Sequence, residues 1–198
     1  MYPLQYQATH DIDWFATINE HPIHLASNGG HLPFDSYTVS ELIAIQHKVA
    51  NMHSTFGYEI DEEYLRNYLD EGDFYSDIDE MSDEEFRMII PERIEINRNY
   101  SRSLMAYTWS FIDMAMKGFL SFDRIKNENG VDYYHLVAWP KNFDHDKFMR
   151  NENSIFSDLH HYDNRKYPHN YRHLNGQNLD RWPYKMMLDL RNNRMLMF

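Results

Sequence analysis

Residues 11–18 and 22–27 are two short stretches in which apolar residues predominate, and the residues between them suit a turn. Short apolar stretches bounded by turn residues are typical of β-strands. The pattern therefore predicts a β-hairpin close to the start of the chain. Gly29 and Gly30 follow it and predict a tight reversal, because glycine adopts backbone angles that other residues avoid.

Two later stretches carry signals for the start of a helix. Thr38 and Glu41 match a capping box, in which each side chain satisfies a free backbone N–H, and the apolar face that follows extends to about residue 52. Ser82 and a glutamate three residues later repeat this pattern ahead of a second short helix. Between them, residues 61–69 predict another short helix and residues 70–80 predict a loop.

The clearest helix is predicted at residues 101–117. Its residues are apolar almost all round, and a helix of this kind belongs in the centre of a fold. A second hairpin is predicted at 119–125 and 131–139, and its second strand has one apolar face. Residues 141–185 predict loops with short helical turns, and the apolar tail 195–198 predicts a docked end. These elements predict an α+β fold, with two β-hairpins packed beside a central apolar helix and with further helices.

Charge is spread unevenly over this predicted single domain, which spans residues 1–198. Residues 57–99, the acidic segment, contain fifteen Asp and Glu against four Lys and Arg, so they carry almost the whole formal charge of −12. Carboxylates interleaved with aromatic side chains are typical of a surface that receives a basic partner. The expected contact residues are Tyr68, Asp70, Asp73, Phe74, Tyr75, Asp77, Asp79 and Glu80. The alternative is a solvated surface, as in a non-catalytic scaffold protein.

Composition excludes several classes of function. The chain has no cysteine, which rules out disulfides, thiolate catalysis and cysteine zinc sites and favours a reducing compartment. It has no signal-peptide pattern and no apolar run long enough to cross a bilayer, so we expect a cytoplasmic protein without a membrane partner. Its acidity argues against nucleic acid as a partner. No phosphate-binding loop, dinucleotide-binding glycine pattern or nucleophile elbow occurs, so no catalytic residue or cofactor is assigned.

The histidines near the end of the chain suggest an alternative to the binding-protein hypothesis, from a different class of function. His169 and His173 lie four residues apart, as two metal ligands on one turn of a helix would. Pro168 and Asn170 weaken a helix there, and no glutamate follows His169 in the position that a zinc-protease motif requires. The alternative function is a metal-dependent hydrolase whose ligands come from His160, His161, Asp163, His169 and His173.

Two further groups of polar residues, one near the start of the chain and one at 70–80, suggest specific chemistry. His10, Asp11 and Asp13 precede or begin the first predicted strand, and His24 lies on its neighbour, so these four side chains could form an acid–base cluster. A hairpin edge with alternating polar residues explains them equally well. Residues 70–80 contain many carboxylates but lack the glycine at the sixth position that a calcium-binding loop needs.

Two blocks of the sequence resemble a known group of proteins. The first is DIDWF followed by PIHLASNGGHLP, at 11–15 and 22–33, and the second is KGFLSFDR followed by YHLVAWP, at 117–124 and 134–140. Both are similar to blocks in small uncharacterised bacterial proteins related to the immunity-type proteins of polymorphic-toxin loci. The resemblance implies a protein that binds and blocks a basic toxin or effector domain, and it implies no catalytic residue.

Overall fold

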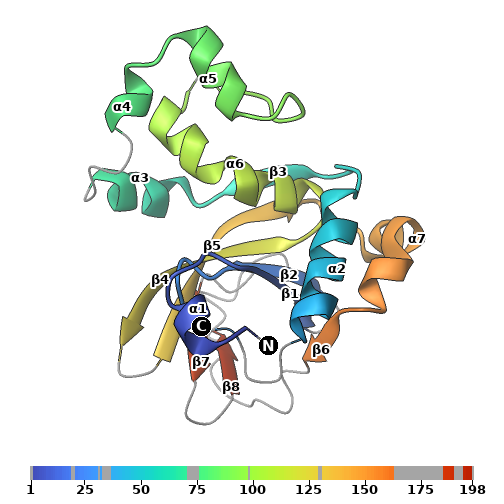
Figure 1. Cartoon of the computed structure of the whole chain (residues 1–198). Coiled ribbons are helices and arrows are strands. Elements are labelled where there is room, and N and C mark those ends of the chain that lie inside the picture. The colour runs from blue at the N-terminus through green and yellow to red at the C-terminus, as the bar shows by residue number, and fades with distance from the viewer. Residues whose placement is uncertain are drawn as a thin grey trace, which may run out of the picture.

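The structure is a computed structural model that describes residues 2–18, 21–30, 32, 37–70, 76–97, 99–128, 131–162, 185–189 and 194–197. Its helices and strands confirm the α+β class (Figure 1). The eight strands of the described residues form one mixed sheet in the order β6-β1-β2-β4-β5-β7-β8, with β3 paired to β5. Both predicted hairpins therefore belong to the same sheet.

The first hairpin lies inside the sheet. Strands β1 (Asp13–Ile18) and β2 (His21–Ala26) pair antiparallel, as predicted. On its other side β1 pairs in parallel with β6 (His160–Tyr162), and β2 pairs in parallel with β4 (Leu120–Glu128). A hairpin edge therefore does not explain Asp13 on β1 and His24 on β2, because β6 and β4 pair with the outer sides of these strands.

The second hairpin holds the rest of the sheet together. Strand β4 pairs antiparallel with β5 (Val131–Lys141), which is long enough to accept further strands along its other edge. These are β3 (Gly57–Ile60), at the end of β5, and β7 (Lys185–Asp189), at its start. Strand β8 (Arg194–Met197) pairs with β7, which confirms that the apolar tail is docked.

Strand β5 is buried on both faces in its second half. Tyr134 and Leu136 lie in the same core cluster as β1 and helix α2, whereas Val137 packs with helix α6 on the opposite face. The prediction that this strand has one apolar face is therefore correct for Val137, but it misses the second apolar face, which contains Tyr134 and Leu136. Helices cover both surfaces of this part of the sheet, so alternation no longer separates buried from exposed positions.

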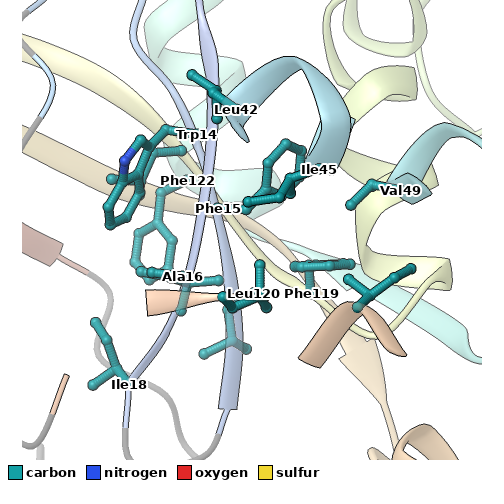
Figure 2. Packing of buried hydrophobic residues seen from close by; sticks show 14 of the residues in the cluster. Trp14, Phe15, Ala16, Ile18, Leu42, Ile45, Val49, Phe119, Leu120 and Phe122 are labelled. Carbon is teal, nitrogen blue, oxygen red and sulfur yellow. The ribbon is translucent and has the colours of Figure 1, made fainter. Parts of the chain in front are cut away.

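Helix α2 (Val39–Ala50) follows the predicted pattern. Its capping box is present, with the Thr38 hydroxyl accepting the Glu41 N–H and the Glu41 carboxylate accepting the Thr38 N–H. The buried face of α2 lies against Phe15 of β1 and Phe119, the residue before β4, as Figure 2 shows. The residues of that face are Leu42, Ile45 and Val49.

Helix α7 (His145–Phe156) corrects the prediction of loops after residue 140. Among the side chains of α7 that the structure describes, only Phe148 and Ile155, seven residues apart, are fully buried, so the apolar pattern is too sparse to predict a helix. A usable signal lies just before it, where the Asp144 carboxylate accepts the Lys147 N–H at 2.9 Å as an N-cap does.

Helix α6 (Arg102–Met116) is central, as predicted. Ser101 caps its start, and Gly118, with φ +101°, follows its end. One face of α6 packs on the sheet through Leu104, Phe111 and Ala115. The adjacent face, about 100° around the helix, packs on the acidic segment, and this contact consists of Met105 and Ile112 against Phe86, Ile90 and Ile94.

The acidic segment contributes three short helices to the fold. It contains α3 (Glu62–Asp70), α4 (Ser76–Asp79) and α5 (Asp83–Ile89), which gather with α6 at one end of the molecule (Figure 1). The Ser82 capping box is present, and the short α4 corrects the prediction that 70–80 is only a loop. The short α1 (Leu4–Gln7) was not predicted. Among the described helices, none has the length and apolar character needed to span a membrane.

Candidate functional site

A cavity of about 640 Å³ lies between helix α6 and strands β1, β2 and β4. The side chains that line it come from both layers, so it exists only when the helix is packed on the sheet. Its walls combine carboxylates, an imidazole and two aromatic rings. The lining residues are Asp11, Asp13, His24, Ala26, Asn28, Ala106, Tyr107, Ser110, Phe111 and Asp123.

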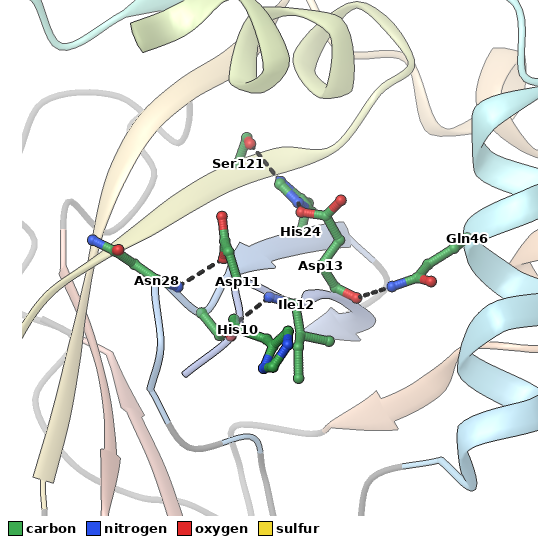
Figure 3. A network of polar contacts seen from close by, with 9 residues as sticks. His10, Asp11, Ile12, Asp13, His24, Asn28, Gln46 and Ser121 are labelled. Atoms are coloured by element: carbon green, nitrogen blue, oxygen red, sulfur yellow. Dashed lines mark hydrogen bonds and ion pairs between the residues drawn. The ribbon is translucent and has the colours of Figure 1, made fainter. Parts of the chain in front are cut away.

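Three polar side chains form a chain of hydrogen bonds beside this cavity (Figure 3). The two ring nitrogens of His24 lie 2.9 Å from Oδ1 of Asp13 and 2.7 Å from Oγ of Ser121. Strand register explains the contact, because His24 on β2 is paired directly with Ser121 on β4. The imidazole is therefore held from both sides.

The order of these residues matches a serine–histidine–aspartate triad, but Ser121 cannot act as a nucleophile here. Ser121 is fully buried, and its side chain is not among those that line the cavity. A nucleophile must reach a reacting atom of the substrate. Ser121 instead fixes the orientation of His24, whose own exposed fraction is 2%.

Two carboxylates of the cavity have pKa values shifted in opposite directions. Burial raises the pKa of Asp123 to about 6, with a contribution from the charge of Asp11, although Tyr107 donates a hydrogen bond to this carboxylate. Partial burial would also raise the pKa of Asp13, but its hydrogen bond and charge interaction with His24 outweigh this and lower it. Such a pair supplies one ionised and one partly protonated carboxyl near neutral pH.

Asp11 and His10 differ in their relation to the cavity. The Asp11 carboxylate accepts the Asn28 N–H at 2.7 Å, where the chain turns with positive φ at Asn28 and Gly29. His10 stacks on Tyr6 with ring centroids 3.8 Å apart and does not line the cavity. The predicted acid–base cluster is thus brought together without His10, and it gains Asp123, which the sequence analysis did not include.

Five of the eight predicted contact residues of the acidic segment lie on or directly after α3 and α4. Asp77 and Glu80 are exposed. Asp79 is exposed too, but it accepts the Ser103 N–H at 3.1 Å and so anchors α4 to the start of α6. Tyr68 and Asp70 lie at the end of α3, where only the backbone is described. Three predicted contacts fall outside the described residues, namely Asp73, Phe74 and Tyr75.

The acidic segment also exposes apolar side chains that the sequence analysis missed. Met88 on α5 is 79% exposed, and its neighbour Ile89 is 37% exposed. Glu84 and Glu85 precede Met88 by four and three residues, so all three share one side of the helix. A signal was present in the sequence, because Met88 lies between the two core positions Phe86 and Ile90 and so points away from them.

The two described histidines of the alternative metal site have other partners. His161 shares a hydrogen bond of 2.6 Å with the Thr17 hydroxyl, and the His160 imidazole packs on the Tyr37 ring with centroids 4.1 Å apart. The other three residues of that hypothesis lie outside the described residues; they are Asp163, His169 and His173. In the part of the chain that the structure describes, no group of three or more potential ligands is placed to hold a metal ion.

Comparison of the chain with family models, with curated proteins and with solved structures finds no match. The resemblance to immunity-type proteins therefore stays a prediction from the two sequence blocks. In the fold these blocks are neighbours, because β2 of the first pairs with β4 of the second. Both contribute side chains to the cavity, among them Asp13 and His24 from the first block and Asp123 from the second.

Proposed function

We propose that this protein is a binding protein that takes a basic protein partner on its acidic segment and acts as an immunity-type inhibitor of a toxin or effector domain. The observation that carries the proposal is the surface of α5, where Met88 is exposed by 79% among glutamates. An apolar anchor inside a charged rim is the usual composition of a protein–protein contact. Carboxylates alone would fit a solvated surface equally well.

The attachment of the acidic segment to α6 supports this function. Phe86, Ile90 and Ile94 bury α5 and the residues after it against α6. Arg93 on this segment also pairs with Asp113 of α6. A binding surface held in place before the partner arrives loses less conformational entropy when it binds.

Charge gives the expected partner its chemistry. The acidic segment contains fifteen Asp and Glu against four Lys and Arg, so a lysine-rich or arginine-rich face complements it. Such charge accelerates association and makes it depend on salt, whereas the apolar anchor sets the rate of dissociation. Blocking the basic face of a toxin domain is then the simplest way for this surface to inhibit it.

The test begins with a pull-down by the tagged protein at low salt and at about 0.5 M salt, where screening extends only a few ångströms. A basic partner captured at low salt is then purified for kinetic binding measurements. The double variant Glu80→Lys with Glu84→Lys should bind at least about tenfold more weakly, mainly through slower association. Met88→Asp should accelerate dissociation.

A matched control changes the same net charge elsewhere. Asp146 and Asp158 are exposed residues at α7 and just after it, outside the acidic segment, and both are replaced by lysine in the control. Its affinity should stay within about threefold of the wild type. If both double variants weaken binding equally, the weakening reflects only the change in net charge. Unchanged binding by a folded Glu80→Lys, Glu84→Lys protein would refute the proposal.

A further inference from the structure

The cavity beneath α6 has the dimensions of a small-molecule site. Its volume of about 640 Å³ lies within the range of ligand pockets in proteins, about 300 to 1,000 Å³. Tyr107 and Phe111 form an aromatic wall on the helix side. Asp13, His24 and Asp123 form the polar wall on the sheet side. A ligand held here would meet ionisable groups on its sheet side and aromatic surface on its helix side.

The polar wall is negatively charged. Three carboxylates line the cavity, from Asp11, Asp13 and Asp123, and none of the described lining residues is Lys or Arg. The nearby Arg124 directs Nη1 to the backbone oxygen of Asn28, at a distance of 3.2 Å. The imidazole of His24 is engaged by Asp13 and Ser121. The cavity therefore favours a cation over a neutral or anionic molecule.

The degree of burial separates the roles of the two main carboxylates. Asp123 is 4% exposed, so its negative charge has little contact with water and is costly until a cation neutralises it. The side chain of Asp13 is 50% exposed and can receive a ligand that enters from solvent. Tyr107 holds the Asp123 carboxylate by a hydrogen bond, which fixes the position of this charge before binding.

A metal ion fits this arrangement poorly. Magnesium and calcium require six or more oxygen ligands that converge on one point. Among the described residues, no three candidate ligands converge in that way. The alternative that remains is a molecule large enough to reach carboxylates that are spread over the wall and to cover the apolar side of the cavity as well.

We propose that this cavity binds a small organic cation, an alkyl ammonium or alkyl guanidinium. Its charged group lies between Asp13 and Asp123, over Ala26, which the strand register places between them. Its hydrocarbon part packs on the Tyr107 and Phe111 rings. This site is independent of the acidic segment, because none of its lining residues belongs to residues 57–99. A failure of one proposal therefore leaves the other standing.

Calorimetric titration with n-butylammonium and n-butylguanidinium tests the proposal, with 1-butanol and butyrate as the neutral and anionic counterparts. The two cations should saturate one site at pH 7.5 with a Kd of about 1 mM or tighter, and the counterparts should show no saturation. Binding of butanol as tight as that of the amine would overturn the proposal. So would the absence of saturation by either cation up to about 20 mM.

Variants locate the site. Asp123→Asn and Asp13→Asn should each weaken binding of the cations at least about tenfold, because each removes one carboxylate from the charged wall. Asp146→Asn, an exposed carboxylate on α7, should bind as the wild type does, and so should Glu80→Lys with Glu84→Lys. Equal losses in the cavity variants and in these controls would show only general attraction of cations to an acidic protein, and would overturn the assignment.

The pH dependence adds a second readout. The ionisable groups at the cavity are Asp11, Asp13, His24, Tyr107 and Asp123, with Arg124 beside Asn28. Asp123 is the lining carboxylate whose pKa is raised, to about 6, so affinity for the cations should rise between pH 5 and pH 7.5. The Asp123→Asn variant should lose this rise. A rise that persists in Asp123→Asn would overturn the role given to this carboxylate.

Discussion

Arg93 and Asp113 form a two-point ion pair, in which Arg93 Nε donates to Oδ1 at 2.6 Å and Nη2 donates to Oδ2 at 2.9 Å. Lys117, one turn along α6, donates to the same carboxylate at 2.8 Å. Asp113 and Lys117 are almost completely buried, whereas half of the Arg93 side chain is exposed. Burial would raise the pKa of Asp113, but the hydrogen bonds from the two cations outweigh it and lower the pKa.

Asp113→Asn should therefore be strongly destabilising. The substitution leaves the buried ammonium of Lys117 without its counter-charge, which costs about 3–5 kcal/mol of unfolding free energy. Urea denaturation followed by circular dichroism measures the change. The control is Asp158→Asn, which breaks the exposed pair with Lys48 and should cost less than about 1 kcal/mol. A loss at Asp113 no larger than that of the control would contradict this account.

Asp123→Asn should stabilise the protein at neutral pH. The pKa of Asp123 is about 6 in the folded protein against 3.8 for the ordinary group, so the folded state binds the extra proton between these values. Its contribution to stability is present below about pH 4 and is lost as pH rises to 6. The variant avoids this loss and should gain roughly 2–3 kcal/mol at pH 7.5 but little at pH 4.

The measurement is the urea midpoint of wild type and Asp123→Asn at both pH values. The asparagine oxygen can still accept the hydrogen bond from Tyr107, so the change mainly reports the charge. Asp146→Asn is the matched control and should show no such pH-dependent gain. A loss of stability in Asp123→Asn at pH 7.5 would mean that the ionised form is stabilised by contacts other than those described.

His21 should make stability depend on pH in the opposite sense. Burial and the charge of His145 lower the pKa of His21 to about 4, from an ordinary value of 6.5. The unfolded chain therefore binds the extra proton in this window, and stability falls as pH falls from 6.5 to 4. His21→Gln should remove about 1–2 kcal/mol of that fall, a value reduced because water reaches part of the ring.

Difference curves of unfolding free energy between pH 4 and pH 7.5 check this prediction. His47→Gln on the exposed side of α2 is the control, and its curve should run parallel to that of the wild type. If the His21 variant also runs parallel to the wild type, the imidazole of His21 titrates normally in the folded protein.

Gly118→Ala should be destabilising by at least about 2 kcal/mol. Gly118 has φ +101°, and a Cβ there would lie 2.8 Å from Cδ2 of Phe148 and 3.1 Å from Cε2 of Phe56. Gly57→Ala is the control, because its nearest neighbour would lie at 3.5 Å and its φ is not in the left-handed region. Thermal unfolding of the two variants should show a large drop only for Gly118→Ala; similar melting temperatures would contradict it.

The sequence predicted those parts of the fold that depend on neighbouring residues. The Thr38 and Ser82 capping boxes and the helix after Ser101 follow from local hydrogen bonds and apolar periodicity, and all are present. Helix α7 was missed because Phe148 and Ile155 alone are fully buried among its described side chains. Strand β6 was missed because three residues pair in parallel with a strand more than a hundred positions earlier, and no local pattern encodes that contact.

In the candidate site, too, local contacts could be predicted from the sequence and long-range contacts could not. Asp13 and His24 lie on adjacent strands of one local hairpin, so the sequence was sufficient to suggest their contact. Asp123 and Tyr107 join them only through the pairing of β2 with β4 and the packing of α6 on the sheet. Neither contact leaves a periodic signal. Predicting the contacts of the acidic segment requires knowing which side chains are exposed. The position of Met88 between the buried Phe86 and Ile90 shows that the helical repeat alone predicts part of this exposure.

The interior position of the first hairpin has a consequence for how the molecule folds. Strand β1 lies between β2 and β6, so its pairing of Ala16 with His160 waits until most of the chain has left the ribosome. Contacts so distant in sequence carry a large loop-closure cost before they stabilise anything. The β1–β2 hairpin therefore emerges before the strands that cover its two edges, and its part of the sheet is completed late.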